Sequence, residues 1–490
     1  MTTTAGTVPL RAAVSHPSPA PRAPHGWGRG DVVVTVLLVA VALVWFHWLA
    51  AGASAQGVIT GEEASISHRD ALALRLGWQP SIWSTNVGGQ LFFWLAGHLD
   101  PDYGLLYARK WKAAATALLP AVVYLVARRR LACGRPAGAV AGVLAVVVPG
   151  VAMLAWVGIE TPLDVVAGLA AVYAATSRTR WWWLGLPLAG VAVSCYTAGL
   201  AVAAVVLLPA VLRVRGVRDG ARAVLGLALG LAVLFVPLLW WRNGGIVVTG
   251  GGRAGADPGA VGEHLRQLAD YAFVSGSSYY YVAELPLFGS ALAAAVLLAG
   301  AVAGVALRPR PTWPWAAVGL ASLALYAVSS GVPGARRVVV AVAVVALLAG
   351  VAVDALVRAV AAAPRRGVLV AGRVVLAVAV ASLVAVPAGA VAGWRGEIAA
   401  GAVALPRDWP FPVDPGGTQT TTLQRLDADL RTGRLDVRAV GDGWGGTRTL
   451  AMLYVLAERT GRVPPLTPRQ LLDYYRVSED CPPLDGPACG

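Results

Sequence analysis

Blocks of about twenty apolar residues recur along this chain, and they constrain its fold more than any other feature. The first block, VVVTVLLVAVALVWFHWLAAGA, runs from Val32 to Ala53. A helix needs about 20 apolar residues to cross a hydrocarbon core ~30 Å thick. Only helices and closed barrels satisfy every backbone polar group in that core. The blocks are rich in Ala, Val and Leu and do not alternate with polar residues, so helices are favoured over barrel strands.

The composition agrees with a membrane protein. Of the 490 residues, 57% are hydrophobic and 13% are charged, whereas soluble domains carry about 25% charged residues. A signal peptide is the alternative for the first block, but its apolar core would span only about 7–15 residues. We therefore expect an all-α polytopic membrane protein of about eleven spans, the later ones near 107–127, 137–157, 163–177, 182–195, 197–212, 223–240, 286–307, 313–330, 338–357 and 368–392.

The formal net charge of +14 comes from arginines that gather at alternate ends of these spans. Cytoplasmic loops are enriched in Lys and Arg, so the pattern predicts a cell-membrane protein with a cytoplasmic N-terminus and an extracytoplasmic C-terminus. Membrane lipids, and not nucleic acid, are then the partners that the basic charge implies. The clusters are Arg128 to Arg130; Arg213, Arg215 and Arg218; Arg308 and Arg310; and Arg358, Arg365 and Arg366.

The chain divides by composition into three parts. Residues 1–30 are rich in Pro, Ala and Arg and read as a disordered cytoplasmic tail. Residues 31–392 form the bundle, with long outside loops at 54–105 and 241–285. Residues 393–490 are ordinary soluble sequence, which predicts a small mixed α/β extracytoplasmic domain. Its Cys481 and Cys489 either pair there or remain two free thiols.

A cluster of charges follows the first span, in TGEEASISHRDALALRLG from Thr60 to Gly77. Thr60 and Glu63 fit a capping box that starts a helix. The box does not account for Glu62, nor for Arg69 and Asp70 on the same side of that helix. Such a face either lies along the membrane interface or lines a polar cavity, where charges at membrane depth serve a function.

Two further motifs place charge on the outside. In WVGIETPLDVV, Glu160 and Asp164 are four residues apart, so one helix face would carry both; favourable charge at a helix N-terminus is the alternative. Arg336 and Arg337 stand at the outside edge of a span, against the positive-inside trend. They contact lipid headgroups or bind a specific phosphate, which Arg does through paired hydrogen bonds.

Carboxylates and an arginine pair at the outer mouth of a bundle suit transfer from a lipid phosphate. A carboxylate can take the proton of an acceptor hydroxyl, and cations can stabilise the departing phosphate. The sequence contains no P-loop, no nucleotide-binding glycine fingerprint and no zinc-ligand spacing. No cofactor is expected; a divalent metal is compatible with this chemistry, but no motif indicates one.

These motifs resemble the GT-C class of glycosyltransferases that use polyprenyl-phosphate sugars, in particular the actinobacterial arabinofuranosyltransferase-like and protein-mannosyltransferase-like enzymes. Those enzymes carry Asp-Asp-Ala-x-Ile-Ser-x-Arg in the first outside loop, where this chain has EEASISHR from Glu62 to Arg69. The arginine-ended second span and the turn from Gly158 to Leu163 are also similar. The leading acid differs, because Glu62 stands where the family has Asp.

The resemblance implies an inverting transfer of sugar from a polyprenyl-phosphate donor to a glycan, lipid or protein acceptor of the cell envelope. It assigns Glu62 as the base with Glu63 in support. Contacts to substrate would come from Arg69, Asp70, Glu160 and Asp164, and contacts to the donor phosphate from Arg336 and Arg337. A flippase for lipid-linked sugars, without chemistry, is the alternative; a scaffold anchored by the bundle is a second.

Overall fold

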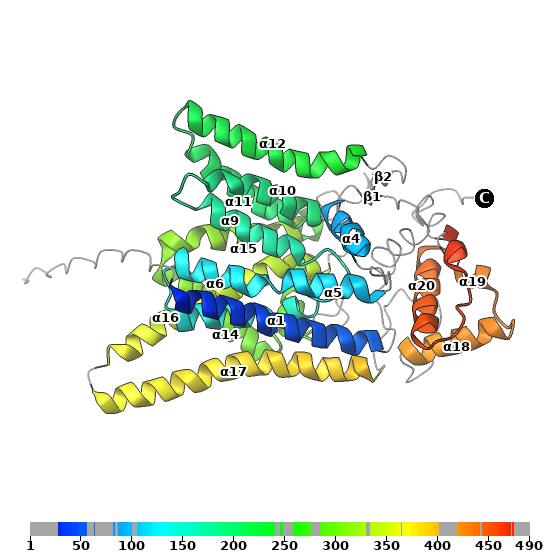
Figure 1. Cartoon of the computed structure of the whole chain (residues 1–490). Coiled ribbons are helices and arrows are strands. Elements are labelled where there is room, and N and C mark those ends of the chain that lie inside the picture. Colours follow the sequence, from blue (N-terminus) through cyan, green and yellow to red (C-terminus); the bar gives the residue numbers. More distant parts are fainter. Residues whose placement is uncertain are drawn as a thin grey trace, which may run out of the picture.

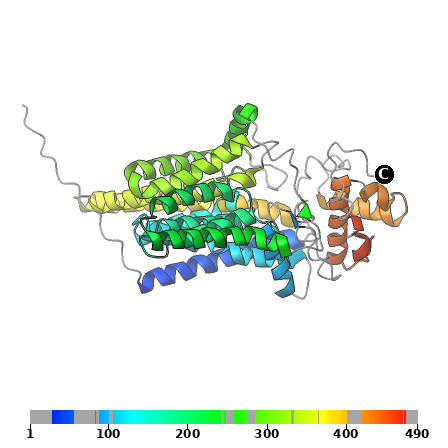
Figure 2. The same cartoon turned by 90° about the horizontal axis from the view of Figure 1, so that it is seen from above.

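The computed structural model describes residues 28–55, 63, 82–83, 87–99, 105–240, 246–247, 258–275, 285–329, 334–363, 365–400, 419–441, 443–471 and 473–474. Within them the chain is a bundle of long helices lying side by side, with a smaller group of helices at one end (Figures 1 and 2). Five helical stretches are long and apolar enough to cross a membrane, namely Arg29–Ser54, Ala108–Arg129, Val217–Val236, Ala335–Ala361 and Arg366–Ala399. The chain is therefore an all-α membrane protein in its described part.

Each predicted span contains helix in the described residues, although one of them, 137–157, is helical only in part. The helices are α1 (Arg29–Ala55), α5 (Leu105–Thr116) and α6 (Leu119–Arg129), α7 (Arg135–Val147), α8 (Pro149–Ala152), α9 (Leu163–Ala175), α10 (Gly185–Cys195), α11 (Gly199–Leu212), α12 (Val217–Trp240), α14 (Ala291–Leu307), α15 (Pro309–Val328), α16 (Val339–Ala361) and α17 (Arg366–Ala399). Short 3-10 turns, η2 (Trp182–Leu184) and η4 (Ala335–Val338), precede α10 and α16.

The helix α16 is the centre of the bundle. It packs against α7, α14 and α15, and nearly all of its first fifteen residues are buried. The helices α12 and α17 lie at the periphery, where Val224 and Val375 are each 68% exposed. Apolar side chains exposed on outer helices are expected of a surface that faces lipid.

One predicted span differs in the structure. The stretch 137–157 was expected to be continuous helix, but α7 ends at Val147 and only the single turn α8 follows. Val148 is extended, with φ −63° and ψ 128°, because the ring of Pro149 disfavours helical backbone at the preceding residue. Residues 153–162 then run without helix and are completely buried. Non-helical backbone at membrane depth requires partners inside the protein.

The turn between α6 and α7 marks one end of the bundle, here called the basic end. Asp31 of α1 accepts hydrogen bonds from Arg128 (2.9 Å) and Tyr124 (2.8 Å). Asp354 of α16 accepts a hydrogen bond from the Gly134 amide at 2.7 Å and also binds the Arg308 guanidinium. Two buried acids thus bind the arginines of this turn. The sequence predicted the arginines at one end of the spans, but not the two acids.

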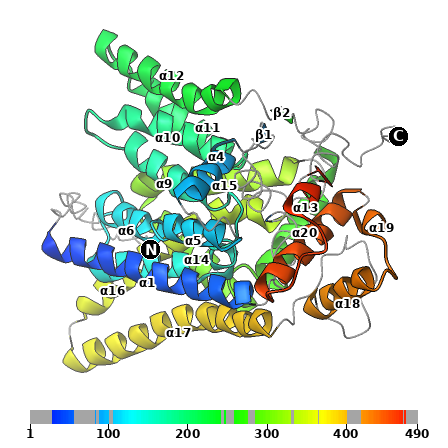
Figure 3. The ribbon, with the colours of Figure 1, turned by 45° about the vertical axis from the view of Figure 1, so that its right-hand side comes forward.

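The opposite end, here called the site end, holds both long predicted loops. The first contains β1 (Ile82–Trp83) and α4 (Val87–Leu99), and the second contains β2 (Ile246–Val247), η3 (Pro258–Ala260) and α13 (Val261–Phe273). The two strands pair in parallel, Ile82 with Ile246. The helix α4 also packs on α5, α10 and α12, so this part of the first loop lies against the bundle (Figure 3).

The C-terminal helices α18 (Gln419–Arg431), α19 (Val437–Gly441) and α20 (Gly443–Arg459) lie beyond the site end (Figure 1). They enclose a hydrophobic core of their own, which includes Leu426, Leu453 and Leu471. Across residues 419–441, 443–471 and 473–474 the chain is helix and turn without a strand. The strands expected in this part of the chain are not among these residues.

Candidate active site

Two cations of α5 point into the protein near the site end. Arg109 is 1% exposed and Lys112 is 0% exposed. They are three residues apart, so they lie on the same face of the helix. A buried charge is costly unless it is paired and hydrogen-bonded, and both cations have such partners.

Arg109 binds Glu63 in a two-pronged ion pair. Its Nε and Nη2 atoms donate to Oε1 and Oε2 of Glu63, each at 2.8 Å, and Nη1 donates to Ser54 Oγ at 2.9 Å. The guanidinium lies 4.9 Å from the centroid of the Trp156 ring. Glu63 Oε1 also accepts a hydrogen bond from the Gly158 amide at 2.7 Å. The pair therefore joins α1, the first loop and the buried segment 153–162.

Lys112 binds the same buried segment through its backbone. Its Nζ atom donates to the carbonyls of Ile159 and Thr161 at 2.5 Å each, and lies 3.5 Å from the carbonyl of Leu154. Its ammonium also interacts electrostatically with the carboxylates of Glu160 and Asp164. One cation therefore binds the carbonyls of the two residues that flank Glu160.

Glu160 and Asp164 are both fully buried. The sequence predicted that they share a helix face, and this is wrong, because α9 begins at Leu163 and Glu160 lies in the non-helical segment before it. The two carboxylates nevertheless interact with each other and with Lys112. The fold of the segment, and not a helical repeat, brings them together.

The helix α4 approaches Glu160 so closely that only glycine fits. A Cβ atom on Gly89 would lie 2.0 Å from Glu160 Cγ and 2.6 Å from Glu160 Cβ. A Cβ on the neighbouring Gly88 would lie 2.2 Å from Ser194 Oγ of α10. The first loop thus covers the acidic pair directly, with backbone against the carboxylate side chain.

Arg336 reaches the same region from η4. Its guanidinium lies 4.7 Å from the centroid of the buried Tyr196 ring, in the short connection between α10 and α11. The preceding residue, Cys195, is buried and interacts electrostatically with Asp164, Glu160 and Lys112. The Arg337 side chain instead interacts with Tyr326 of α15. The predicted arginine pair therefore separates, and only Arg336 lies against Tyr196, the residue that follows Cys195.

Of the predicted site residues, the structure thus groups Glu63, Glu160 and Asp164 near Lys112, and it places Arg336 against the ring of Tyr196. Glu62, Arg69 and Asp70 fall outside the described residues, as does Thr60 of the expected capping box. Sequence reasoning missed Arg109 and Lys112, although charges inside an apolar span were a usable signal. It also missed Gly89, for which the sequence alone offers no signal.

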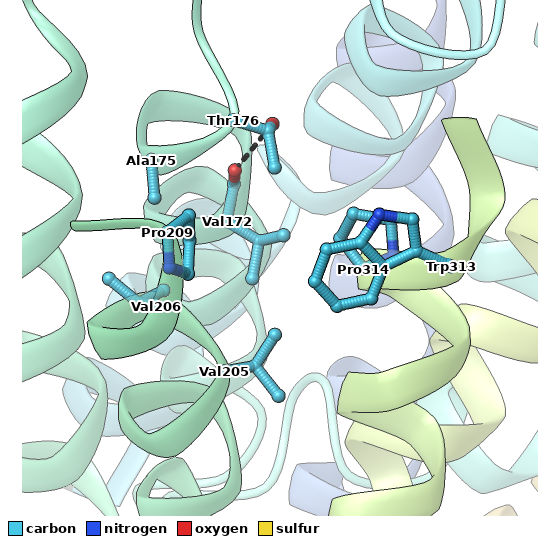
Figure 4. Close-up of a pocket in the computed structure, with 8 residues that line it drawn as sticks. All are labelled: Val172, Ala175, Thr176, Val205, Val206, Pro209, Trp313 and Pro314. Carbon is cyan, nitrogen blue, oxygen red and sulfur yellow. Dashed lines mark hydrogen bonds between the residues drawn. The ribbon is translucent and has the colours of Figure 1, made fainter. Parts of the chain in front are cut away.

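A small apolar pocket lies elsewhere, between α9, α11 and α15 (Figure 4). Val172, Val206 and Trp313 are among its lining residues, and Thr176 Oγ1 donates to the carbonyl of Val172 at 2.7 Å. It lies toward the basic end, eight or more residues along α9 from Asp164, which is roughly 12 Å at 1.5 Å per residue. The charged cluster, and not this pocket, is the candidate active site.

Among the described residues no group of three or more His, Cys, Asp or Glu side chains is arranged to hold a metal ion. No family model matches the sequence, and no curated protein matches it.

Proposed function

We propose that this protein is an integral-membrane glycosyltransferase of the GT-C class. It transfers a sugar from a polyprenyl-phosphate donor to a glycan, lipid or protein acceptor of the cell envelope. The topology that belongs to this proposal has eleven spans, a cytoplasmic N-terminus and an extracytoplasmic tail. The site end then faces outward, where a lipid-linked sugar and an envelope acceptor meet.

The observation that carries the proposal is the convergence of charge at the site end. Glu160 comes from the segment 153–162, Asp164 from α9 and Lys112 from α5, and Arg336 of η4 lies against Tyr196 near this group. Intramembrane charges that are buried together commonly mark a functional centre. An acidic group and an arginine in one region supply the two things that sugar transfer from a phosphate requires.

The reaction is a single displacement with inversion. The acceptor hydroxyl oxygen forms a bond to the anomeric carbon while the bond from that carbon to the phosphate oxygen breaks. Glu62 takes the hydroxyl proton as general base. The polyprenyl phosphate leaves with an additional negative charge, which Arg336 stabilises through charged hydrogen bonds. Glu160 and Asp164, with Arg69 and Asp70, contact the hydroxyls of the sugar or the acceptor.

The test uses membranes that contain the full chain and labelled polyprenyl-phosphate mannose or arabinose. Label should enter envelope material with the wild-type protein and fall by about 10²–10⁴-fold with Glu62→Gln, the usual contribution of a general base. Glu397→Gln is the matched control, since Glu397 is exposed on α17 at the same end of the bundle. Equal transfer by the wild type and Glu62→Gln would remove Glu62 from the mechanism.

The same membranes distinguish the flippase alternative. Intact labelled donor that crosses the bilayer, with no label in any acceptor and no release of polyprenyl phosphate, would replace the transferase proposal with lipid transport. Absence of both transfer and transport with either donor would overturn the proposal for these sugars.

A further inference from the structure

The buried segment 153–162 has an unusual set of supports. It lies inside a helical bundle without helical hydrogen bonds of its own along most of its length. Backbone groups in such a place must find partners from other elements. Besides local backbone bonds, the partners include side chains of residues far away in the sequence, and the cations among them come from one face of α5.

Lys112 holds this segment at the two positions that flank Glu160. The carbonyls of Ile159 and Thr161 both accept from its Nζ at 2.5 Å, so the carbonyls of the residues before and after Glu160 are bound to one atom. Arg109 acts one step earlier, through Glu63, whose carboxylate accepts from the Gly158 amide. Four consecutive residues, 158 to 161, therefore include three that α5 fixes directly or through Glu63.

We infer that Lys112 is a positioning residue, which places Glu160 and Asp164 by donating hydrogen bonds to the carbonyls of Ile159 and Thr161. Arg109 and Glu63 hold the preceding turn in the same way, so Glu63 acts on the site through the backbone of Gly158. A lysine suits this task because a single ammonium offers three donors from one point. The charge of Lys112 also offsets those of the two buried acids.

The catalytic part of this inference rests on the proposed function, but the structural part does not. Amide hydrogen exchange of the full chain in lipid nanodiscs therefore tests it first. In Lys112→Met, peptides that cover residues 153–162 should exchange at least tenfold faster, while peptides from α16 should be unchanged. Lys110→Met is the matched control, because Lys110 is exposed on the same helix. Exchange in 153–162 that equals the wild type would overturn the inference.

Two further variants guard against a folding defect. Lys112→Gln replaces Lys112→Met if the latter is not monodisperse. It keeps an N–H donor for one carbonyl, and amide exchange in residues 153–162 should still be faster than in Lys110→Met. Lys112→Arg keeps the charge and several donors, and should return exchange at least halfway to the wild type. Exchange in Lys112→Gln that equals that of the Lys110→Met control would overturn the role of Lys112 in binding the carbonyls.

Kinetics then separate positioning from substrate contact. With transfer established for the wild type, Lys112→Met should lower kcat at least tenfold and change the donor KM less than threefold. An unchanged kcat with a raised KM would instead make Lys112 a donor ligand and overturn the positioning role. If exchange rises as expected while even the wild type transfers no sugar, the positioning of the acids stands and the proposed function fails.

Discussion

Arg109 and Glu63 form an ion pair with two parallel hydrogen bonds of 2.8 Å, and neither side chain is more than 1% exposed. The pair spans a long stretch of sequence, from the first loop to α5. Breaking a buried pair by removing one partner leaves the other charge unpaired in a place where water cannot replace the partner. The cost of such a change exceeds what an exposed ion pair would contribute.

We therefore expect Glu63→Gln to lower the free energy of unfolding by about 3–5 kcal/mol. Thermal or denaturant unfolding in detergent measures the effect. The double variant Glu63→Gln with Arg109→Met should be less destabilised than the sum of the two single variants, because it removes both charges. A Glu63→Gln protein as stable as the wild type would show that the ion pair contributes little to the fold.

The sequence predicted the helices well and the site only in part. The apolar blocks form helices because a helix of this length and composition crosses the hydrocarbon core with its backbone polar groups hydrogen-bonded, and few other structures do. The exception is where Pro149 follows Val148 and ends the helix early. The end of the helix before Pro149 could be predicted from the sequence. The contacts of residues 153–162 could not, since many different partners would have been compatible with this segment. The contact of Lys112 with Ile159 and Thr161 depends on the packing of two separate spans.

The location of the arginines at the basic end could be predicted from the sequence. Arg128 and Arg308 were placed at one end by their position between spans, and both bind acids there. Position along the chain suffices for such groups because they lie at helix ends. The arginine pair of η4 was predicted to act as one unit, yet only Arg336 of these two neighbours in a 3-10 turn lies against Tyr196, in the connection between α10 and α11.

A second prediction concerns Gly89. Because its Cβ would lie 2.0 Å from Glu160 Cγ, Gly89→Ala must displace either α4 or the carboxylate. Overpacking of this kind costs about 1–3 kcal/mol, and transfer should fall at least tenfold as Glu160 moves. Unfolding and transfer assays measure the two effects. The control is Gly393→Ala on α17, where a Cβ meets nothing within 4 Å; equal behaviour of the two variants would contradict the prediction.

A third prediction follows from the separation of Arg336 and Arg337. Under the proposed function Arg336→Gln should raise the donor KM by about ten- to a hundredfold, which corresponds to the loss of a charged hydrogen bond of ~1.5–3 kcal/mol. Arg337→Gln should change the KM less than threefold, because Arg336 and not Arg337 lies against Tyr196. Steady-state kinetics with varied donor concentration provide the comparison. Similar KM values for the two variants would restore the pair as a joint phosphate site.

A fourth prediction concerns orientation, which the arginine pattern sets. Glu397 is exposed at the site end and Arg310 is exposed at the basic end. In intact cells an impermeant maleimide should label Glu397→Cys and leave Arg310→Cys unlabelled until the membrane is opened. The background should carry Cys481→Ser and Cys489→Ser, while Cys133 and Cys195 can remain because both are buried.

The orientation experiment also decides where the acids can act. A positive charge excess on the cytoplasmic side is a statistical rule of insertion, whereas the location of Glu160 and Asp164 at the site end is a property of the fold. If Arg310→Cys were labelled in intact cells and Glu397→Cys were not, the site end would face the cytoplasm. The acceptor would then be a cytoplasmic molecule, and transfer to the cell envelope would be excluded whatever the chemistry of the cluster.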